Sequence, residues 1–245
     1  MKLTCYQATH IGKREDNQDS YAQVMGTDWA CYIVTDGLGG HFRGDLAAKE
    51  VCQSMVKHAP RFSDQIQKDP VLGMSQLIEC AIHEMQNHIR EAYQEIDTQT
   101  TLAMAWLNQD HIITAHVGDS RVYRLNKSQI LWRTPDHTEV QALFEAGKIT
   151  EADFSSHPLQ NHLLRSVNMF EIPDADLFVH PALEQEETLI LCTDGFWGNC
   201  QPEDLISLAK NNGSLSKKLE TLIDSFVTTN PHCDNITVQV VKHQI

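Results

Sequence analysis

Residues 102–132 read LAMAWLNQDHIITAHVGDSRVYRLNKSQILW, and this stretch predicts four short β-strands. The strands correspond to β-rich runs at 102–107, 111–117, 121–125 and 129–132. Only Asn108–Asp110 separates the first two runs, and only Asn126–Ser128 separates the last two. Connections of three turn-forming residues are too short for a crossover helix. Each pair should therefore form an antiparallel hairpin.

Further strands and several helices surround these hairpins. More β-rich runs occur at 29–35, 188–193 and 236–241. Apolar residues spaced at i, i+3 and i+4, together with a proline at one helix start, predict helices over 48–56, 77–96, 202–211 and 215–226. Because these helices cluster instead of alternating with strands, the predicted fold class is α+β, with antiparallel sheets packed against helices.

The stretch from Thr138 to Arg165 differs from its surroundings. It contains two short helical segments, one over 138–146 and one capped by Thr150 with Asp153, followed by polar residues. We interpret it as a flap, about 138–166, inserted in a single domain over 1–245. No long-period repeat, low-complexity tract or linker marks a second domain.

Three features near the flap are interpreted as having no role in chemistry. His137 and His162 lie in or beside it and are expected to be structural or surface residues. The segment 174–178 is interpreted as a surface turn.

Composition and charge exclude several classes of protein. Of the 245 residues, 41% are hydrophobic and 21% are charged, which is typical of a globular protein with a substantial core. The 19 Lys and Arg against 33 Asp and Glu give a net charge of −14. This charge repels phosphate backbones and anionic lipids, so we expect neither a nucleic-acid partner nor a membrane partner.

The cysteines indicate a reducing compartment. There are seven, several of them inside apolar runs, and no C-x-x-C pair occurs. The first residues carry no apolar signal region, and no stretch approaches 18 apolar residues. We therefore expect a cytoplasmic protein.

Four acidic residues occur at the ends of predicted strands. Asp36 and Asp194 each stand in a Thr-Asp-Gly triplet directly after an apolar strand, Asp119 follows another strand, and Asp234 precedes the last one. Convergent carboxylates stay ionised when hard divalent cations with oxygen ligands bind among them. The glycine after the acid, here Gly37, has no Cβ and lets its own carbonyl approach a cation. The pattern predicts a Mg²⁺ or Mn²⁺ site.

The segment Gly12 to Asp19 adds a cation and another acid. Arg14 beside a metal cluster suits bidentate phosphate binding. An arginine at such a position, taken alone, is more often an ordinary surface charge.

These residues together resemble the metal-dependent protein serine/threonine phosphatases, the PPM or type 2C family, of the bacterial single-domain kind. The motifs that carry the resemblance are Gly12-Lys13-Arg14 with Asn17-Gln18-Asp19, Thr35-Asp36-Gly37-Leu38-Gly39-Gly40-His41, Thr100-Thr101, Val117-Gly118-Asp119-Ser120-Arg121, Asp136-His137-Thr138, Cys192-Thr193-Asp194-Gly195 and Asp234-Asn235. They extend from about Tyr6 to Val241. The family fold is a sandwich of two antiparallel β-sheets flanked by pairs of helices, which agrees with the α+β prediction.

The resemblance implies a site for two Mn²⁺ or Mg²⁺ ions. Asp36 would bridge both ions, the Gly37 carbonyl would hold one, and Asp194 and Asp234 would hold the other. A water between two cations loses its proton near neutral pH and can attack phosphorus in line. No covalent phosphoenzyme is then required.

The same resemblance assigns the remaining site residues. Asp19 would orient metal-bound water, Asp119 with Asp194 would form a labile third-metal site, and Arg14 would grip the substrate phosphate. Leu38 stands where some relatives have a histidine proposed as general acid, so water or a metal-bound water would protonate the leaving group.

The implied function is hydrolysis of phosphoserine and phosphothreonine in proteins, opposing a serine/threonine kinase, by a monomer. Two alternatives stay open at this point. One is a non-catalytic phosphoprotein-binding signalling module of the same fold, and the other is a metal-dependent hydrolase of a nucleotide or sugar phosphate.

Overall fold

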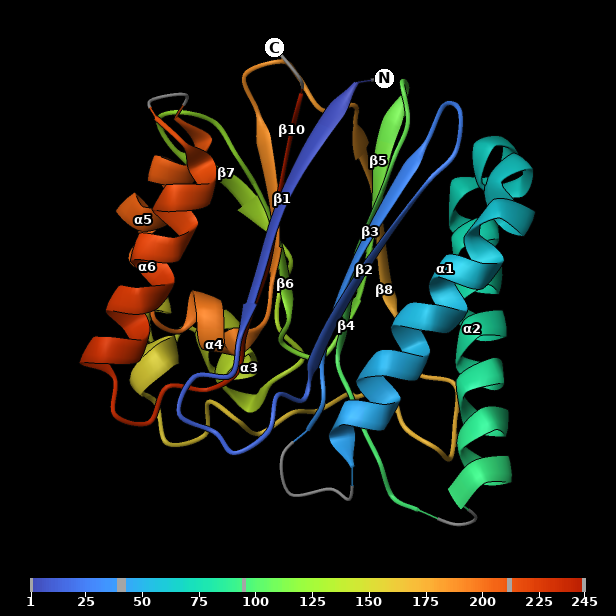
Figure 1. Cartoon of the computed structure of the whole chain (residues 1–245), viewed down its shortest axis with the longest axis horizontal. Helices are drawn as coiled ribbons and strands as arrows, with labels where there is room; N and C mark the ends of the chain where they lie inside the picture. The colour runs from blue at the N-terminus through green and yellow to red at the C-terminus, as the bar shows by residue number, and fades with distance from the viewer. Residues whose placement is uncertain (1, 39–42, 94–95, 211–212, 244–245) are drawn as a thin grey trace.

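The fold is a β-sandwich with helices on both outer faces (Figure 1). The computed structural model describes residues 2–38, 43–93, 96–210 and 213–243. The predicted α+β sandwich is confirmed. The motif residues Gly39-Gly40-His41 and the predicted helix end at Asn211 lie outside the described residues.

Each sheet has five strands among the residues described. The first sheet has the spatial order β1 (Leu3–His10), β10 (Ile236–His243), β9 (Thr188–Cys192), β6 (Arg121–Leu125) and β7 (Ile130–Arg133). The second has the order β2 (Asp19–Met25), β3 (Ala30–Asp36), β4 (Leu102–Leu107), β5 (His111–Val117) and β8 (Asp176–Pro181). All neighbouring strands are antiparallel. Both predicted hairpins, β4 with β5 and β6 with β7, are confirmed.

A pair of helices covers the outer face of each sheet. The helices are α1 (Gly44–Lys68) and α2 (Pro70–Tyr93) on the second sheet, and α5 (Pro202–Ala209) and α6 (Leu215–Thr229) on the first. Buried Met55 and Leu77 pack on one side of the molecule, and Leu208 and Phe226 on the other. All four predicted helices are present, but α2 ends before Ile96.

The inner faces of the two sheets share an apolar core. Its members are contributed by both sheets, and fully buried examples are Tyr32, Val34, Ala105, Leu189 and Leu191. Each Å² of apolar surface that is removed from water favours the folded state by roughly 25 cal/mol. The core therefore holds the two sheets in fixed alignment, and with them any site built from both.

The chain crosses from one sheet to the other at Gly118–Ser120, between β5 and β6. Gly118 has φ +98°, and a Cβ there would lie 2.7 Å from the Cγ2 of Thr101. An L side chain is therefore excluded on both conformational and steric grounds. This crossing places Asp119 between the two sheets at one end of the sandwich.

Three strands lie outside the runs predicted from the sequence: β1, β2 and β8. All three are edge strands with mixed exposure, so they lack the continuous apolar runs of the central strands. The interpretation of residues 174–178 as a surface turn is wrong for Asp176–Phe178, because these residues begin β8 and pair with β5.

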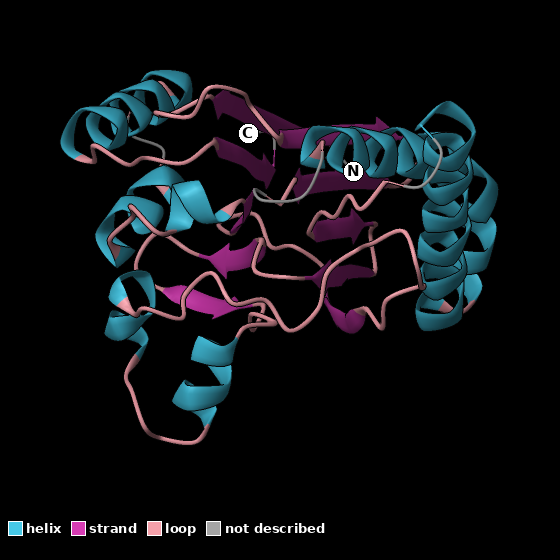
Figure 2. Cartoon of the chain, turned by 90° about the horizontal axis from the view of Figure 1, so that it is seen from below, coloured by secondary structure: helices cyan, strands magenta, loops and turns pink. Residues whose placement is uncertain are grey.

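The flap carries the two helical segments predicted for it. They are α3 (Glu139–Glu145), with the Thr138 side chain as its N-cap, and the 3₁₀ helix η1 (Glu151–Ser156), with a capping box of Thr150 and Asp153. Phe144 and Phe154 pack edge to face between them, with ring centroids 5.4 Å apart. Figure 2 shows this unit at the lower left, away from α1 and α2.

Candidate active site

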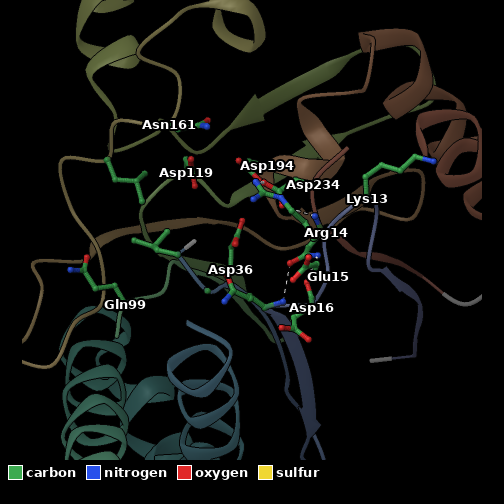
Figure 3. A pocket seen from close by; sticks show the side chains of 15 residues that line it. Lys13, Arg14, Glu15, Asp16, Asp36, Gln99, Asp119, Asn161, Asp194 and Asp234 are labelled. Atoms are coloured by element: carbon green, nitrogen blue, oxygen red, sulfur yellow. Dashed lines mark hydrogen bonds and ion pairs between the residues drawn. The ribbon is translucent and has the colours of Figure 1, made fainter. Parts of the chain in front are cut away.

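Acidic side chains from both sheets meet in a cleft of about 740 Å³ at one end of the sandwich (Figure 3). Asp36 comes from the end of β3, and Asp119 from the crossing after β5. Asp194 begins the short helix α4 (Asp194–Trp197), directly after β9, and Asp234 precedes β10. The four strand-end carboxylates predicted from the sequence to converge therefore all line one cleft.

Asp19 joins this cluster through strand pairing. It is the first residue of β2 and lies directly opposite Asp36 of β3. Its Oδ2 accepts a 2.9 Å hydrogen bond from the hydroxyl of Thr193, which precedes Asp194. Asp19 therefore connects the acidic end of one sheet to that of the other.

Threonines fix the backbone of Asp36. The Thr101 hydroxyl accepts from the Asp36 N–H at 2.9 Å, and the Asp36 carbonyl accepts from the Thr101 N–H and the Thr100 hydroxyl, both at 2.8 Å. These bonds orient the peptide groups on both sides of the side chain, so the carboxylate position is set before any ligand binds.

The two Thr-Asp-Gly triplets have a packing reason. A Cβ at Gly37 would lie 2.4 Å from the carbonyl carbon of Gly44, at the start of α1. A Cβ at Gly195 would lie 2.0 Å from the carbonyl oxygen of Asn235. At both places a glycine lets the backbone beside the acid touch the next element. The glycines therefore bring the elements that carry the acids close together.

Burial makes the negative charges of the cluster costly. It raises the pKa of Asp19 to about 7 and that of Asp194 to about 6, and repulsion from the neighbouring acids, Asp234 among them, adds to both shifts. Burial raises the pKa of Asp36 and that of Asp119 well above the usual value, again with repulsion from nearby carboxylates, Asp194 among them. The protein alone does not balance this charge.

The donor set fits hard divalent cations. The Oδ1 atoms of Asp19 and Asp194 are buried and have no hydrogen-bond partner. Buried polar atoms without partners are rare and call for a bound ion or water. Carboxylate oxygens with a nearby carbonyl are the ligands that Mg²⁺ and Mn²⁺ prefer. Asp36, Gly37, Asp119, Asp194 and Asp234 line the cleft, whereas Asp19 lines a separate pocket beside α1.

Arg14 lies at the mouth of the cleft, where its Nη2 donates to Asp234 Oδ2 at 2.6 Å (Figure 3). About half of its side chain is exposed, at 53%. This hydrogen bond and the charges of Asp234, Asp194 and Asp36 raise the pKa of Arg14. An exposed, permanently charged guanidinium at the rim can reach an anion that enters the cleft.

Asn235 holds the Arg14 loop in place, a role that the sequence did not reveal. Its Oδ1 accepts from the Gln18 N–H at 2.8 Å, and its Nδ2 donates to the carbonyls of Ile11 and Asp16 at 2.8 and 3.0 Å. The sequence signal was its position directly after Asp234, but its partners lie more than 200 residues away. Asn235 thereby ties the loop to the start of β10.

Comparison with known proteins identifies the family. A family model described as protein phosphatase 2C matches residues 6–231. The chain belongs to this family. The serine/threonine phosphatase stp of Listeria monocytogenes is 30% identical over 221 residues, which cover 87% of this chain and 84% of that protein.

Solved structures agree with this membership. The S. agalactiae serine/threonine phosphatase is 26% identical, covers 99% of this chain and 100% of its own, and superposes with a TM-score of 0.80. The catalytic domain of the phosphatase PstP, in complex with two manganese ions, is 21% identical, covers 98% of both chains and has a TM-score of 0.75. At that identity the likeness shows the shared fold. The family and fold predicted from the sequence are confirmed.

Among the residues that the structure describes, none of the helices has the length and apolar character needed to cross a bilayer.

Proposed function

We propose that this protein hydrolyses phosphoserine and phosphothreonine in proteins, with two Mn²⁺ or Mg²⁺ ions bound in the acidic cleft. The observation that carries the proposal is the convergence of Asp36, Asp119, Asp194 and Asp234 from both sheets, with a buried carboxylate oxygen left unpartnered. The names of the Listeria and S. agalactiae relatives support the substrate class.

Each acidic residue of the site has a role that follows from its position. Asp36, the Gly37 carbonyl, Asp194 and Asp234 would hold the two ions. The ions supply an activated water nucleophile and neutralise charge on the transferring phosphoryl group. Asp19 lies opposite Asp36 in the strand pair and accepts a hydrogen bond from Thr193, and it would orient that water.

Arg14 binds the phosphate in this proposal. Its Nη2 donates one hydrogen to Asp234 Oδ2, and the guanidinium has further N–H groups that can donate to a phosphate oxygen. An arginine that stays charged stabilises the charge that develops on phosphorus. Leu38, which also lines the cleft, has no proton to give, so water protonates the leaving group.

Three finer points belong to the same proposal. Asp119, with Asp194, would hold a third and more weakly bound ion. The flap, 138–166, would form part of the substrate surface in a single domain, because Asn161 and Leu163 line the cleft. The substrates are proteins phosphorylated by a serine/threonine kinase, with no role for nucleic acid. The protein works as a monomer in the cytoplasm, in keeping with seven free cysteines and a net charge of −14.

The direct test is hydrolysis of a phosphothreonine peptide by the purified chain with Mn²⁺, with EDTA, and with Asp36→Asn. We expect phosphate release that requires Mn²⁺ and falls by at least about 10³-fold in Asp36→Asn, because Asp36 would contact both ions. Asp224→Asn on the exposed face of α6 is the matched control and should keep full activity.

The alternatives give different results in the same assay. A folded wild type that stays inactive with every divalent ion, yet binds the phosphopeptide, would be a phosphoprotein-binding module. Hydrolysis of nucleotide or sugar phosphates but not of the peptide would indicate a metal-dependent hydrolase of small phosphoesters.

A further inference from the structure

A second group of titratable side chains lies beside the acidic cleft. His116, His137 and Asp176 bring potential ligand atoms within 4.8 Å of one another, and both histidines are buried. The two imidazole rings stack, with centroids 4.6 Å apart and an angle of 24° between their planes. Two histidines and a carboxylate can form a transition-metal site, so the protonation of each nitrogen decides what this group does.

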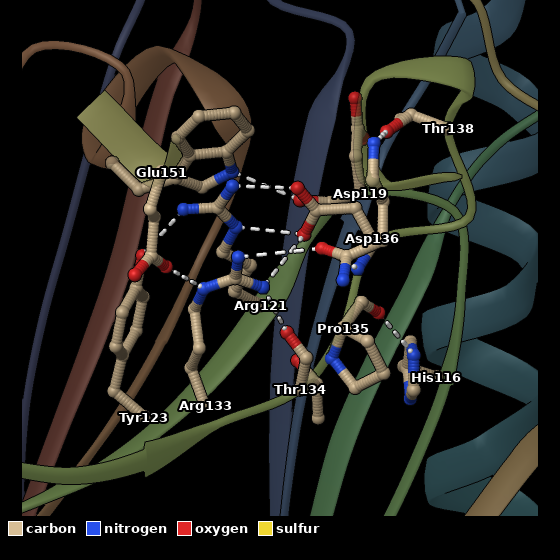
Figure 4. Close-up of polar contacts among 12 residues, drawn as sticks. His116, Asp119, Arg121, Tyr123, Arg133, Thr134, Pro135, Asp136, Thr138 and Glu151 are labelled. Carbon is tan, nitrogen blue, oxygen red and sulfur yellow. Dashed lines mark hydrogen bonds and ion pairs between the residues drawn. The ribbon is translucent and has the colours of Figure 1, made fainter. Parts of the chain in front are cut away.

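The hydrogen-bond partners assign the protons and argue against a bound cation. His116 Nε2 is 2.7 Å from the Pro135 carbonyl (Figure 4), which accepts only, so this nitrogen carries the hydrogen. His137 Nδ1 accepts from the Gly118 N–H at 3.2 Å, so in the neutral ring Nε2 carries the hydrogen. His137 Nε2 lies 3.4 Å from Asp176 Oδ2 and 3.4 Å from Arg165 Nη1, so it already has neighbours where a cation would bind. Only His116 Nδ1 is left free.

The same bonds give His137 another role. Its backbone N–H donates to the Gly118 carbonyl at 2.9 Å, while its Nδ1 accepts from the Gly118 N–H. His137 thus holds the peptide groups on both sides of Gly118. The next residue is Asp119, whose carbonyl accepts from the indole N–H of Trp197 at 2.9 Å. Three successive peptide groups are therefore held by side chains or backbone from elsewhere in the chain.

Asp176 and Arg165 hold His137 in this state. Arg165 Nη1 donates to Asp176 Oδ1 at 2.6 Å, and Asp176 Oδ2 accepts from His137. Burial and the nearby charge of Arg165 lower the pKa of His137 by more than Asp176 raises it, so the balance favours the neutral ring. The Leu164 N–H also donates to the His137 carbonyl at 2.7 Å, so the end of the flap is tied to the same residue.

We infer that His137 is a positioning residue that sets the Asp119 carboxylate in the acidic cluster, and that Asp176 of β8 maintains the tautomer this requires. The inference rests on the proposed function, because it assigns His137 to the Asp119 side of the cation site. It gives a specific form to the expected structural role of His137, whose side chain is buried.

The test combines a metal-free readout with a metal-binding readout. His137→Leu removes the acceptor at Nδ1, whereas His137→Asn returns an acceptor oxygen near the same place. In the metal-free protein, we expect the Gly118 amide to exchange with solvent at least about tenfold faster in His137→Leu than in wild type or His137→Asn. Calorimetric titration with Mn²⁺ should then give a weakest binding step at least about tenfold weaker in His137→Leu, with His137→Asn close to wild type.

Two further variants complete the design. Asp176→Ala removes the carboxylate that faces His137 Nε2, so either tautomer of the imidazole can form. We expect the weakest Mn²⁺-binding step to weaken by a smaller factor than in His137→Leu. Because Asp176 is partly exposed, this variant should stay folded and tests the inference even if His137→Leu unfolds. His180→Leu is the matched control: its ring also stacks from β8, at 4.1 Å on Trp132, but its Nε2 lies 3.1 Å from the Thr114 hydroxyl instead of at Gly118. It should leave the Mn²⁺ steps unchanged.

The outcomes separate this inference from the proposed function. Wild-type protein that binds no Mn²⁺ contradicts the proposed function itself. Wild-type binding that persists unchanged in both His137→Leu and Asp176→Ala overturns the role of His137 alone. A binding step lost in His137→Asn as fully as in His137→Leu would mean that the imidazole is a ligand, and would overturn the inference in favour of a cation between the two histidines.

Discussion

Two buried groups of charge lie next to each other in this protein and are treated in opposite ways. Arg121 and Asp136 form a complete pair, with Nε to Oδ1 at 2.7 Å and Nη2 to Oδ2 at 2.5 Å (Figure 4). Arg121 also donates to the Tyr123 hydroxyl at 2.8 Å, and its guanidinium carbon lies 3.4 Å from the centroid of the Trp197 ring. Two residues before Arg121, Asp119 belongs to a cluster in which buried carboxylate oxygens have no partner.

The difference shows where the chain provides its own cation and where it does not. The Arg121 and Asp136 side chains are 6% and 2% exposed, and every charge is matched by a neighbour. In the acidic cluster, Asp19, Asp36 and Asp194 repel one another, and among the described acids Arg14 forms its ion pair with Asp234. In the first arrangement the buried charges compensate each other, whereas in the second the unfavourable charge is relieved when a divalent ion binds.

The largest expected effect comes from breaking the complete pair. Asp136→Asn leaves the Arg121 charge buried without its counter-charge, and should lower the free energy of unfolding by about 3–5 kcal/mol. Urea denaturation followed by circular dichroism measures this. A loss below about 1 kcal/mol would mean that the pair contributes no more than a surface contact.

Binding of Mn²⁺ to the acidic cleft should instead raise the free energy of unfolding. Mn²⁺ at about a hundred times its dissociation constant should raise the free energy of unfolding by about 2.7 kcal/mol, because only the folded chain presents the site. The measurement is urea denaturation with Mn²⁺ and with EDTA. Asp194→Asn should lose this gain, while its metal-free form should be at least as stable as metal-free wild type, since a repelling charge is gone.

The pH dependence of the metal-free protein provides a third comparison. Folding raises the pKa of Asp19 to about 7 and that of Asp194 to about 6, so the folded state binds more protons than the unfolded state between about pH 4 and 7. The stability associated with these groups is complete below about pH 4 and is lost as the pH rises through 6 and 7. Each unit of pKa shift corresponds to about 1.4 kcal/mol, and the losses from the two groups have the same sign.

Thermal or urea unfolding at pH 5 and pH 7.5 in EDTA measures this loss. Asp19→Asn removes one of the two groups and should give a flatter pH dependence in the same window. An equal slope in wild type and variant would contradict the assignment to Asp19.

The smallest effect is expected at the surface. Lys127 and Glu186 form an ion pair at 2.5 Å, but their side chains are 40% and 74% exposed. Glu186→Gln should change the free energy of unfolding by less than about 1 kcal/mol, because solvent screens such pairs. The urea assay used for Asp136→Asn compares the two pairs directly. An equal decrease in the free energy of unfolding for both variants would contradict the idea that burial decides how much an ion pair matters.

Sequence reasoning predicted the central strands, the helices and the acids at strand ends because each leaves a local pattern. The run at 102–107 is buried on both faces and continuously apolar, and the run at 112–117 is equally buried and rich in apolar and β-branched residues. β1, β2 and β8 lie at sheet edges, where partial exposure removes that pattern. Convergence of Asp36 with Asp194 followed from their repeated triplet.

The contributions of Asn235 and His137 could not be predicted in the same way. Asn235 acts on Gln18, which is 217 positions away, and His137 acts on Gly118 through a crossing between two sheets. Both depend on contacts that only the folded chain creates. His137 in particular depends on Asp176, in a segment whose strand the sequence did not reveal.

The order of the strands bears on when activity can arise during synthesis. β10 comes last of the described strands along the chain, yet it lies inside its sheet, between β1 and β9. Until Ile236–His243 has left the ribosome, β1 and β9 lack the neighbour that both require, and Asp234 has no fixed place. A chain that stops before Asp234 therefore lacks both this acid and an interior strand of the first sheet, and we expect it to release no phosphate from a phosphothreonine peptide.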